Sequence, residues 1–75
     1  MKSLIEYLAR ALADHPDDVR VEEEQRDDRV VIHLFVNEED KGRVICRDGR
    51  VANAMRSLLH VAAVRTGVRA SLDIE

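Results

Sequence analysis

The sequence contains few residues of several types, and each shortage limits what the protein can be. A single cysteine, Cys46, cannot form an internal disulfide, so we expect a protein of a reducing compartment, the cytoplasm. No apolar run approaches the length of a membrane span, and because Glu6 and Arg10 interrupt residues 1–13, we expect no signal peptide. Tyr7 and Phe35 are the only aromatic residues, which excludes a binding surface built from stacked rings.

The side-chain patterns of an enzyme active site or a metal centre are also missing. His15, His33 and His60 share no ligand-like spacing with one another or with Cys46. Because Cys46 has no second cysteine to resolve it and no base tied to it by a motif, we favour a packing role over a reactive thiol. We therefore expect no catalytic residue, no metal, no cofactor and no small-molecule substrate.

Charge is distributed unevenly along the 75 residues, which suffice for one domain with a small hydrophobic core. The net charge is −3, but residues 14–40 sum to −8 and residues 41–56 sum to +4. The only acid in the basic segment is Asp48, and its bases are Lys41, Arg43, Arg47, Arg50 and Arg56. The mild overall acidity therefore conceals a basic patch.

Hydrophobic periodicity predicts helices over residues 3–13, about 38–45 and 50–66, and strands near 19–24, 29–36 and 68–74. Asn37 is a candidate cap for the second helix, and Gly67 for the end of the third. The order α-β-β-α-α-β implies an α+β sandwich, in which helices pack on one face of a three-stranded sheet.

The apolar residues of these elements predict which faces are buried. In the third helix we expect one inward stripe, made of Val51, Ala54, Met55, Leu58, Val61 and Ala62. In the strand over 29–36 the even-numbered residues face the core, which leaves Val31 and Phe35 on the opposite face. That pair is either a partner surface or two sporadic exposed hydrophobic residues.

Residues 46–49, Cys-Arg-Asp-Gly, join the two later helices. A turn that ends at Gly49 and immediately opens a helix leaves backbone N–H groups unpaired and presents the positive end of the helix dipole. With the surrounding arginines, this arrangement favours an anion and predicts a phosphate site. Without further information, the alternative is a tight connection between two packed helices.

The residues around this turn resemble a known family. Residues 43–50, RVICRDGR, are similar to the V-I-G-x-x-G-R signature of KH domains, whose G-x-x-G loop clamps about four nucleotides by the backbone. Residues 4–16 and 52–56 resemble the short bacterial KH proteins of the KhpA or YlqC family, so the resemblance covers nearly the whole chain. One departure stands out, because Cys46 occupies the position of the first glycine.

The resemblance implies a single type II KH domain over residues 1–75, with a three-stranded mixed sheet. It also implies single-stranded RNA as a ligand, and a homodimer or a heterodimer with a larger KH-domain protein. The RNA-binding residues expected from it are Arg43, Ile45, Cys46, Arg47, Asp48, Gly49, Arg50 and Asn53.

Two features of the loop keep an alternative open. Cys46 adds a side chain where a nucleic-acid backbone must approach closely, and Asp48 adds a carboxylate that repels phosphate. The alternative is a degenerate KH scaffold that acts as a protein-interaction or dimerisation module with weak or no RNA binding. Val44, Ile45 and Val51 are likewise either an apolar floor for bases or ordinary core residues.

Overall fold

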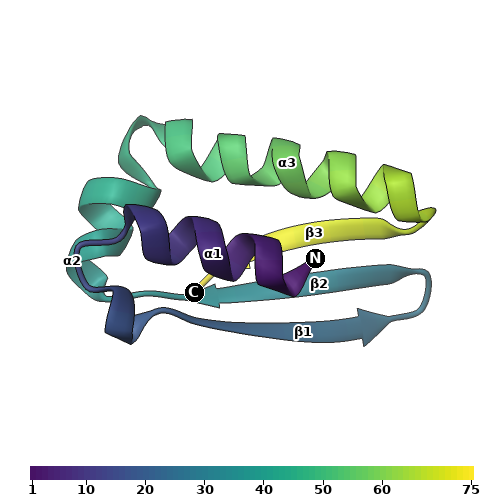
Figure 1. The fold of residues 1–75 in the computed structure, drawn as a ribbon, viewed down its shortest axis with the longest axis horizontal. Helices are drawn as coiled ribbons and strands as arrows, with labels where there is room; N and C mark the ends of the chain where they lie inside the picture. The colour runs from purple at the N-terminus through teal and green to yellow at the C-terminus, as the bar shows by residue number, and fades with distance from the viewer.

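The computed structural model describes all residues from 1 to 75 and has an α+β fold. Figure 1 shows its elements, which follow one another as α1 (Lys2–Leu12), η1 (Pro16–Asp18), β1 (Arg20–Arg26), β2 (Arg29–Phe35), α2 (Glu38–Asp40), η2 (Lys41–Ile45), η3 (Arg47–Gly49), α3 (Arg50–Thr66) and β3 (Arg69–Ile74). The predicted order of helices and strands is confirmed. The short 3-10 turn η1 was not predicted from the sequence.

The three strands form one mixed sheet in the order β1-β2-β3. β1 and β2 are antiparallel and joined by a tight turn at Asp27, whose φ of 32° is one of two positive values outside glycine. β3 runs parallel to β2, because α3 carries the chain back along the sheet before β3 begins. The turn at Asp27 and the loop before α3 therefore lie at opposite ends of the molecule (Figure 1).

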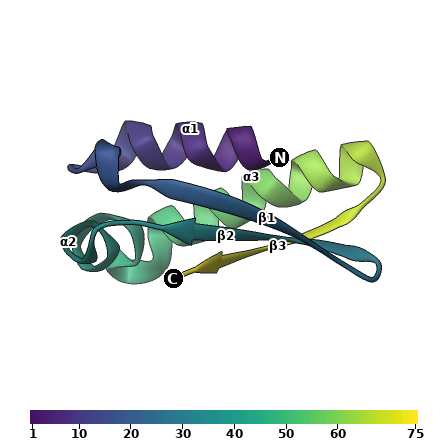
Figure 2. The ribbon, with the colours of Figure 1, turned by 90° about the horizontal axis from the view of Figure 1, so that it is seen from below.

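The core lies between the helices and one face of the sheet. Seen from below, α1 lies over β1, and the strands twist beneath it (Figure 2). α3 packs against β3 and contacts α1. The side chains that meet in this layer are apolar and buried: Ile5, Ala9, Val19, Val21, Val30, Ile32, Leu34, Ile45, Met55, Leu59 and Leu72. None of the helices combines the length and apolar composition that a bilayer crossing requires.

The buried face of α3 differs from the predicted stripe. Ala52, Met55, Leu59 and Ala63 are buried, and only Met55 belongs to the predicted set. Leu58 and Val61 are instead 46% and 53% exposed. The helix has apolar residues on two faces, and its periodicity does not tell which of the two the sheet covers.

The prediction that Val31 and Phe35 are exposed together was wrong. Val31 is only 2% exposed, and in the sheet it lies between Glu24 of β1 and Ser71 of β3. Phe35 is half-buried, because the Arg20 guanidinium lies 4.5 Å from its ring centre in a cation–π contact. Val31 and Phe35 therefore do not form an exposed apolar pair on this face of the sheet.

Candidate nucleic-acid interface

The approach to the loop is held in place by the buried carboxylate of Asp40, at the end of α2. Its two oxygens accept hydrogen bonds from the backbone N–H groups of Asp14 and His15, at 3.0 and 2.9 Å, and one lies 3.3 Å from His15 Nδ1. Burial by itself would raise the pKa of Asp40, but these hydrogen bonds outweigh it and lower the pKa below its ordinary value. Asp40 thereby joins the end of α1 to the start of the helical segment that leads into the loop.

That segment begins as predicted and then changes its hydrogen-bonding pattern. The Asn37 side chain accepts a hydrogen bond from the Glu39 N–H at 2.9 Å, which confirms the predicted cap. From Lys41 the backbone widens into η2, a stretch of π-helix that ends where the Cys46 N–H donates to the Lys41 carbonyl at 2.9 Å. Such widened turns are often found at functional sites.

The loop itself turns through two consecutive left-handed residues. Asp48 has φ 55° and Gly49 has φ 71°, and Arg50 then starts α3 with no side-chain cap. Aspartate tolerates this conformation better than most residues, because its short side chain can satisfy nearby backbone groups. Cys46, in contrast, has φ −97°, so the backbone conformation at the first position of the motif does not require glycine.

Gly49 is the glycine that the geometry requires, whereas Gly42 is not. A Cβ at Gly49 would sit at a positive φ and 3.4 Å from Asn53 Nδ2, while a Cβ at Gly42 would meet nothing within 4 Å. The side chain of Asn53 thus approaches the loop backbone from the first turns of α3. The structure thus places the predicted site residue Asn53 against the loop.

The arginines around the loop have no acidic partners. Arg43, Arg47 and Arg50 are exposed, and none takes part in any ion pair of the structure. Arg56, one turn and a half further along α3, is also exposed and unpaired. Asp48 lies among these arginines but is not within ion-pair distance of any of them. The positive charge of the segment is therefore available to an anion from outside.

The apolar residues of the segment divide between the loop surface and the core. Val44 and Val51 are half-buried and line a shallow hollow of about 360 Å³ together with Arg43, Arg47, Asp48 and Arg50. Ile45 is 0% exposed and packs in the core, so its side chain lies beneath the loop and not on the loop surface. Of the two interpretations of Ile45, an apolar floor for bases or a core residue, its burial favours the core residue.

Two further hollows lie between α3 and the edge strand β3. Both are lined by His60, Ala70 and Ser71, so they form one groove, with Arg56 at one hollow and Arg29 and Arg69 at the other. The residues of β3 were not among the predicted site residues. The alternation of residues 68–74 gave the strand but not its edge position, which depends on the parallel pairing with β2.

The fold has the order α-β-β-α-α-β and a mixed three-stranded sheet, and the loop before α3 ends in the left-handed Gly49. Together these features define a type II KH domain. A family model described as the KH domain of KhpA and KhpB matches residues 2–74. The chain therefore belongs to the KhpA/KhpB KH-domain family.

Individual relatives agree with this assignment over the full length of the chain. The RNA-binding protein KhpA of Halalkalibacterium halodurans is 47% identical over 74 residues, which are 99% of this chain and 97% of the relative. The proteins of the same name from Clostridium acetobutylicum and Bacillus subtilis are 39% and 35% identical, over 99% of this chain and 99% and 91% of theirs. These relatives are named as RNA-binding proteins and not as enzymes. No match was found among solved structures.

Proposed function

We propose that the protein binds single-stranded RNA in the cytoplasm at the loop of residues 46–49, with the phosphates held by backbone N–H groups and by Arg43, Arg47 and Arg50. The observation that carries this proposal is the left-handed turn at Asp48 and Gly49, surrounded by exposed arginines without acidic partners. Relatives named RNA-binding protein KhpA support RNA as the ligand. Loops of this kind clamp the backbone of single strands.

The two unusual loop residues fit this proposal. Cys46 needs no glycine-only conformation, so its cost is limited to the room that its Cβ and sulfur occupy next to the RNA backbone. Asp48 repels phosphate, but three exposed arginines flank it, and the net charge of the loop stays positive. RNA binding is therefore retained, and it is weaker than in a loop with both glycines.

Bases of the bound strand would continue into the groove between α3 and β3. This groove is open, lined by Ala70 and Ser71 of the edge strand, and contains Arg56 at the end nearer the loop. The unpaired backbone edge of β3 offers hydrogen-bonding groups to base edges. The half-buried Val44 and Val51 give the apolar surface beside the loop.

The test is fluorescence anisotropy of the protein with a labelled, mixed-sequence single-stranded RNA at low and moderate salt. Replacing Arg47 and Arg50 together by glutamate should abolish binding, because two phosphate contacts become repulsions. A variant with Lys2→Glu and Arg65→Glu is a matched control, since it makes the same charge change at two exposed residues away from the loop.

Equal RNA binding by the loop variant and the wild type would remove the loop from the proposal. Loss of binding in both variants would reduce the interaction to overall charge. A Cys46→Gly version adds a second comparison, because it should bind more tightly if the cysteine side chain hinders the approach of RNA.

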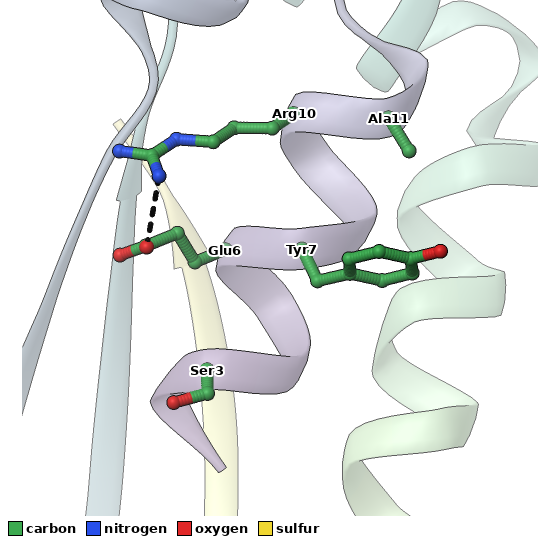
Figure 3. Close-up of a pocket in the computed structure, with 5 residues that line it drawn as sticks. All are labelled: Ser3, Glu6, Tyr7, Arg10 and Ala11. Carbon is green, nitrogen blue, oxygen red and sulfur yellow. Dashed lines mark hydrogen bonds and ion pairs between the residues drawn. The ribbon is translucent and has the colours of Figure 1, made fainter.

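A second function, pairing with another KH domain, is favoured by the outward face of the helices. On α1, Figure 3 shows Glu6 and Arg10 on one side of the helix and Tyr7 and Ala11 on the other. Tyr7 is 72% exposed, and Val64 of α3 is 63% exposed, in addition to Leu58 and Val61. Large apolar side chains of this exposure suit a protein partner. The partner would be a second copy or a larger KH-domain protein, as the joint family of KhpA and KhpB suggests.

Sedimentation velocity tests this second function. If the wild type is a dimer, Leu58→Glu with Val61→Glu should give a monomer, because charges would be buried in the contact. Val68→Glu, which changes a residue 40% exposed outside the helices, is the matched control and should leave the dimer intact. A dimer that survives the double change uses another surface.

A further inference from the structure

The face of the sheet turned away from the helices gathers polar side chains around His33 of β2. In the strand register, His33 lies opposite Asp73 on β3 and Glu22 on β1. Its ring is held from two sides, because Nε2 lies 2.9 Å from a Glu24 oxygen and Nδ1 lies 3.4 Å from a Glu75 oxygen. The His33 side chain is only 20% exposed, so this ring is a fixed part of the surface.

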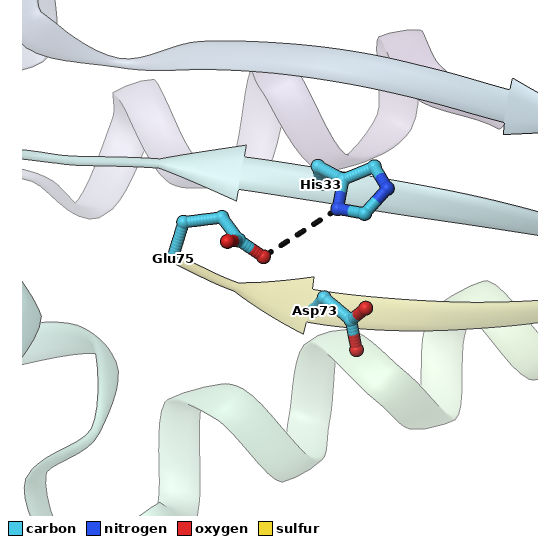
Figure 4. A group of neighbouring side chains, drawn as sticks. All are labelled: His33, Asp73 and Glu75. Carbon is cyan, nitrogen blue, oxygen red and sulfur yellow. Dashed lines mark hydrogen bonds and ion pairs between the residues drawn. The ribbon is translucent and has the colours of Figure 1, made fainter.

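Three of these side chains bring metal-ligating atoms together, as Figure 4 shows. One nitrogen of His33 and one carboxylate oxygen each of Asp73 and Glu75 lie within 4.8 Å of one another. Around a zinc ion with bonds of about 2.0–2.2 Å, neighbouring ligand atoms are about 3.4 Å apart, so small rotations of two exposed carboxylates would close the set. Asp73 takes part in no ion pair, and its charge acts on the Arg26 guanidinium only from beyond ion-pair distance.

Glu24 holds the imidazole ring of His33 from the side opposite the other two side chains. It comes from β1 and holds Nε2, which leaves Nδ1 directed toward Glu75. A carboxylate on the far nitrogen of a histidine is the usual partner of a metal-bound imidazole, because it fixes the ring and its tautomer. Glu24 is itself held by Arg26, whose Nε lies 3.0 Å from its other oxygen.

We propose that His33, Asp73 and Glu75 form a binding site for a divalent transition metal of the zinc type, with Glu24 as the residue that orients the imidazole. One imidazole with two carboxylates is a ligand set for such metals, whereas magnesium and calcium take oxygen ligands throughout. Water completes the coordination on the open side of the sheet.

This site would tie the three strands together at one point. His33 belongs to β2, Asp73 and Glu75 to β3 and the residue that follows it, and Glu24 to β1. In the unfolded chain His33 and Asp73 are forty residues apart, so the metal binds the folded state in preference and stabilises it. The site is on the sheet and does not include any residue of the loop. Zinc binding and RNA binding can therefore be tested independently.

The test is a titration of the full chain with zinc chloride, followed by isothermal calorimetry and by amide chemical shifts. It uses Cys46→Ser protein, because the exposed thiol of the loop would otherwise compete for zinc. We expect one zinc per chain, shifts centred on His33, Asp73 and Glu75, and a higher unfolding temperature with zinc. Magnesium at the same concentration should produce none of these changes.

Variants then identify the ligands. His33→Gln should weaken zinc binding at least about tenfold, and Glu24→Gln should weaken it about 10- to 100-fold, the range found for such orienting partners. His60→Gln changes an exposed histidine in the α3–β3 groove and is the matched control. Asp73→Asn is a second ligand variant that keeps the test valid if His33→Gln is unstable. Zinc binding that is unchanged in both ligand variants, or shifts centred on His15 or His60, would overturn the proposal.

Discussion

Two regions of this domain have many exposed charges, and they differ in whether those charges have partners. On the open sheet face, arginines and acids pair with one another, as in Arg26 with Glu24 and Arg20 with Glu22. Around the loop before α3, the arginines are exposed and have no partner. The comparison teaches that the number of arginines in a segment says less about anion binding than the presence or absence of neighbouring acids.

The pKa values on the sheet face reflect this pairing. Hydrogen bonds from Arg26 and then His33 lower the pKa of Glu24 to about 2. The hydrogen bond to Glu24, against the effect of burial and with help from Glu75, raises the pKa of His33. These charges stabilise each other within the protein, whereas the loop arginines have no acidic partner in the protein.

Among the single changes that compare the loop with the rest of the molecule, Gly49→Ala should have the largest effect on RNA affinity. Gly49→Ala places a Cβ at φ 71°, which costs about 1–2 kcal/mol in a left-handed conformation, and the loop should shift to relieve it. If that cost falls on the bound state, RNA affinity drops about tenfold, since about 1.4 kcal/mol corresponds to a factor of ten. Fluorescence anisotropy with labelled RNA measures the affinity of both proteins. Gly42→Ala is the control and should leave affinity unchanged, because its Cβ meets nothing within 4 Å.

A smaller effect is expected from removing single arginines. Arg47→Gln should weaken RNA binding several-fold and lower the slope of log affinity against log salt by about 0.7, the value for one phosphate contact on a single strand. Arg26→Gln on the sheet face should leave both quantities unchanged, because Arg26 is already paired with Glu24. The same loss of slope in both variants would contradict the distinction between the two regions.

Removing an acid should act in the opposite direction at the loop. Asp48→Asn takes away the only negative charge of the segment and keeps a residue that tolerates φ 55°. RNA affinity should rise about two- to threefold at low salt, and the gain should shrink as salt increases. Glu22→Gln on the sheet face is the control. An affinity that rises equally in both variants would mean that only net charge matters.

The smallest effect concerns stability and the buried Asp40 behind the loop. Because hydrogen bonds lower the folded-state pKa of Asp40, its stabilising contribution is present above the ordinary aspartate pKa of about 4 and is lost as the pH falls further. In urea denaturation, Asp40→Asn should be less stable than wild type at pH 7, and its stability should fall less steeply below pH 4. Asp17→Asn, at an exposed residue, should follow the wild-type pH profile.

Much of the fold could be predicted because its boundaries are set by local chemistry. Gly49 and Gly67 limit α3 at Arg50–Thr66 as expected, and the alternation of residues 29–36 gives β2 and its core face. The choice between the two apolar faces of α3 could not be predicted, since it depends on where the sheet lies. The burial of Val31 likewise depends on its cross-strand neighbours, Glu24 and Ser71.

The candidate site could be predicted in its position but not in its details. Charge and the family motif indicate the loop, yet they do not show that Cys46 has an ordinary negative φ while Asp48 is left-handed. They also do not separate Ile45, which is buried, from Val44 and Val51, which line the hollow. The cluster around His33 has no sequence signal, because its members meet only through the parallel register of β2 and β3.

One measurement tests the central claim most directly: amide chemical shifts of the ¹⁵N-labelled protein during titration with single-stranded RNA. The unpaired arginines of the loop predict that RNA changes the amide chemical shifts of residues from Arg43 to Asn53 and along the α3–β3 groove. The amide chemical shifts of β1 should not change. Shifts centred on the paired charges of the open sheet face, or no shifts at RNA concentrations that saturate a glycine-restored Cys46→Gly protein, would contradict it.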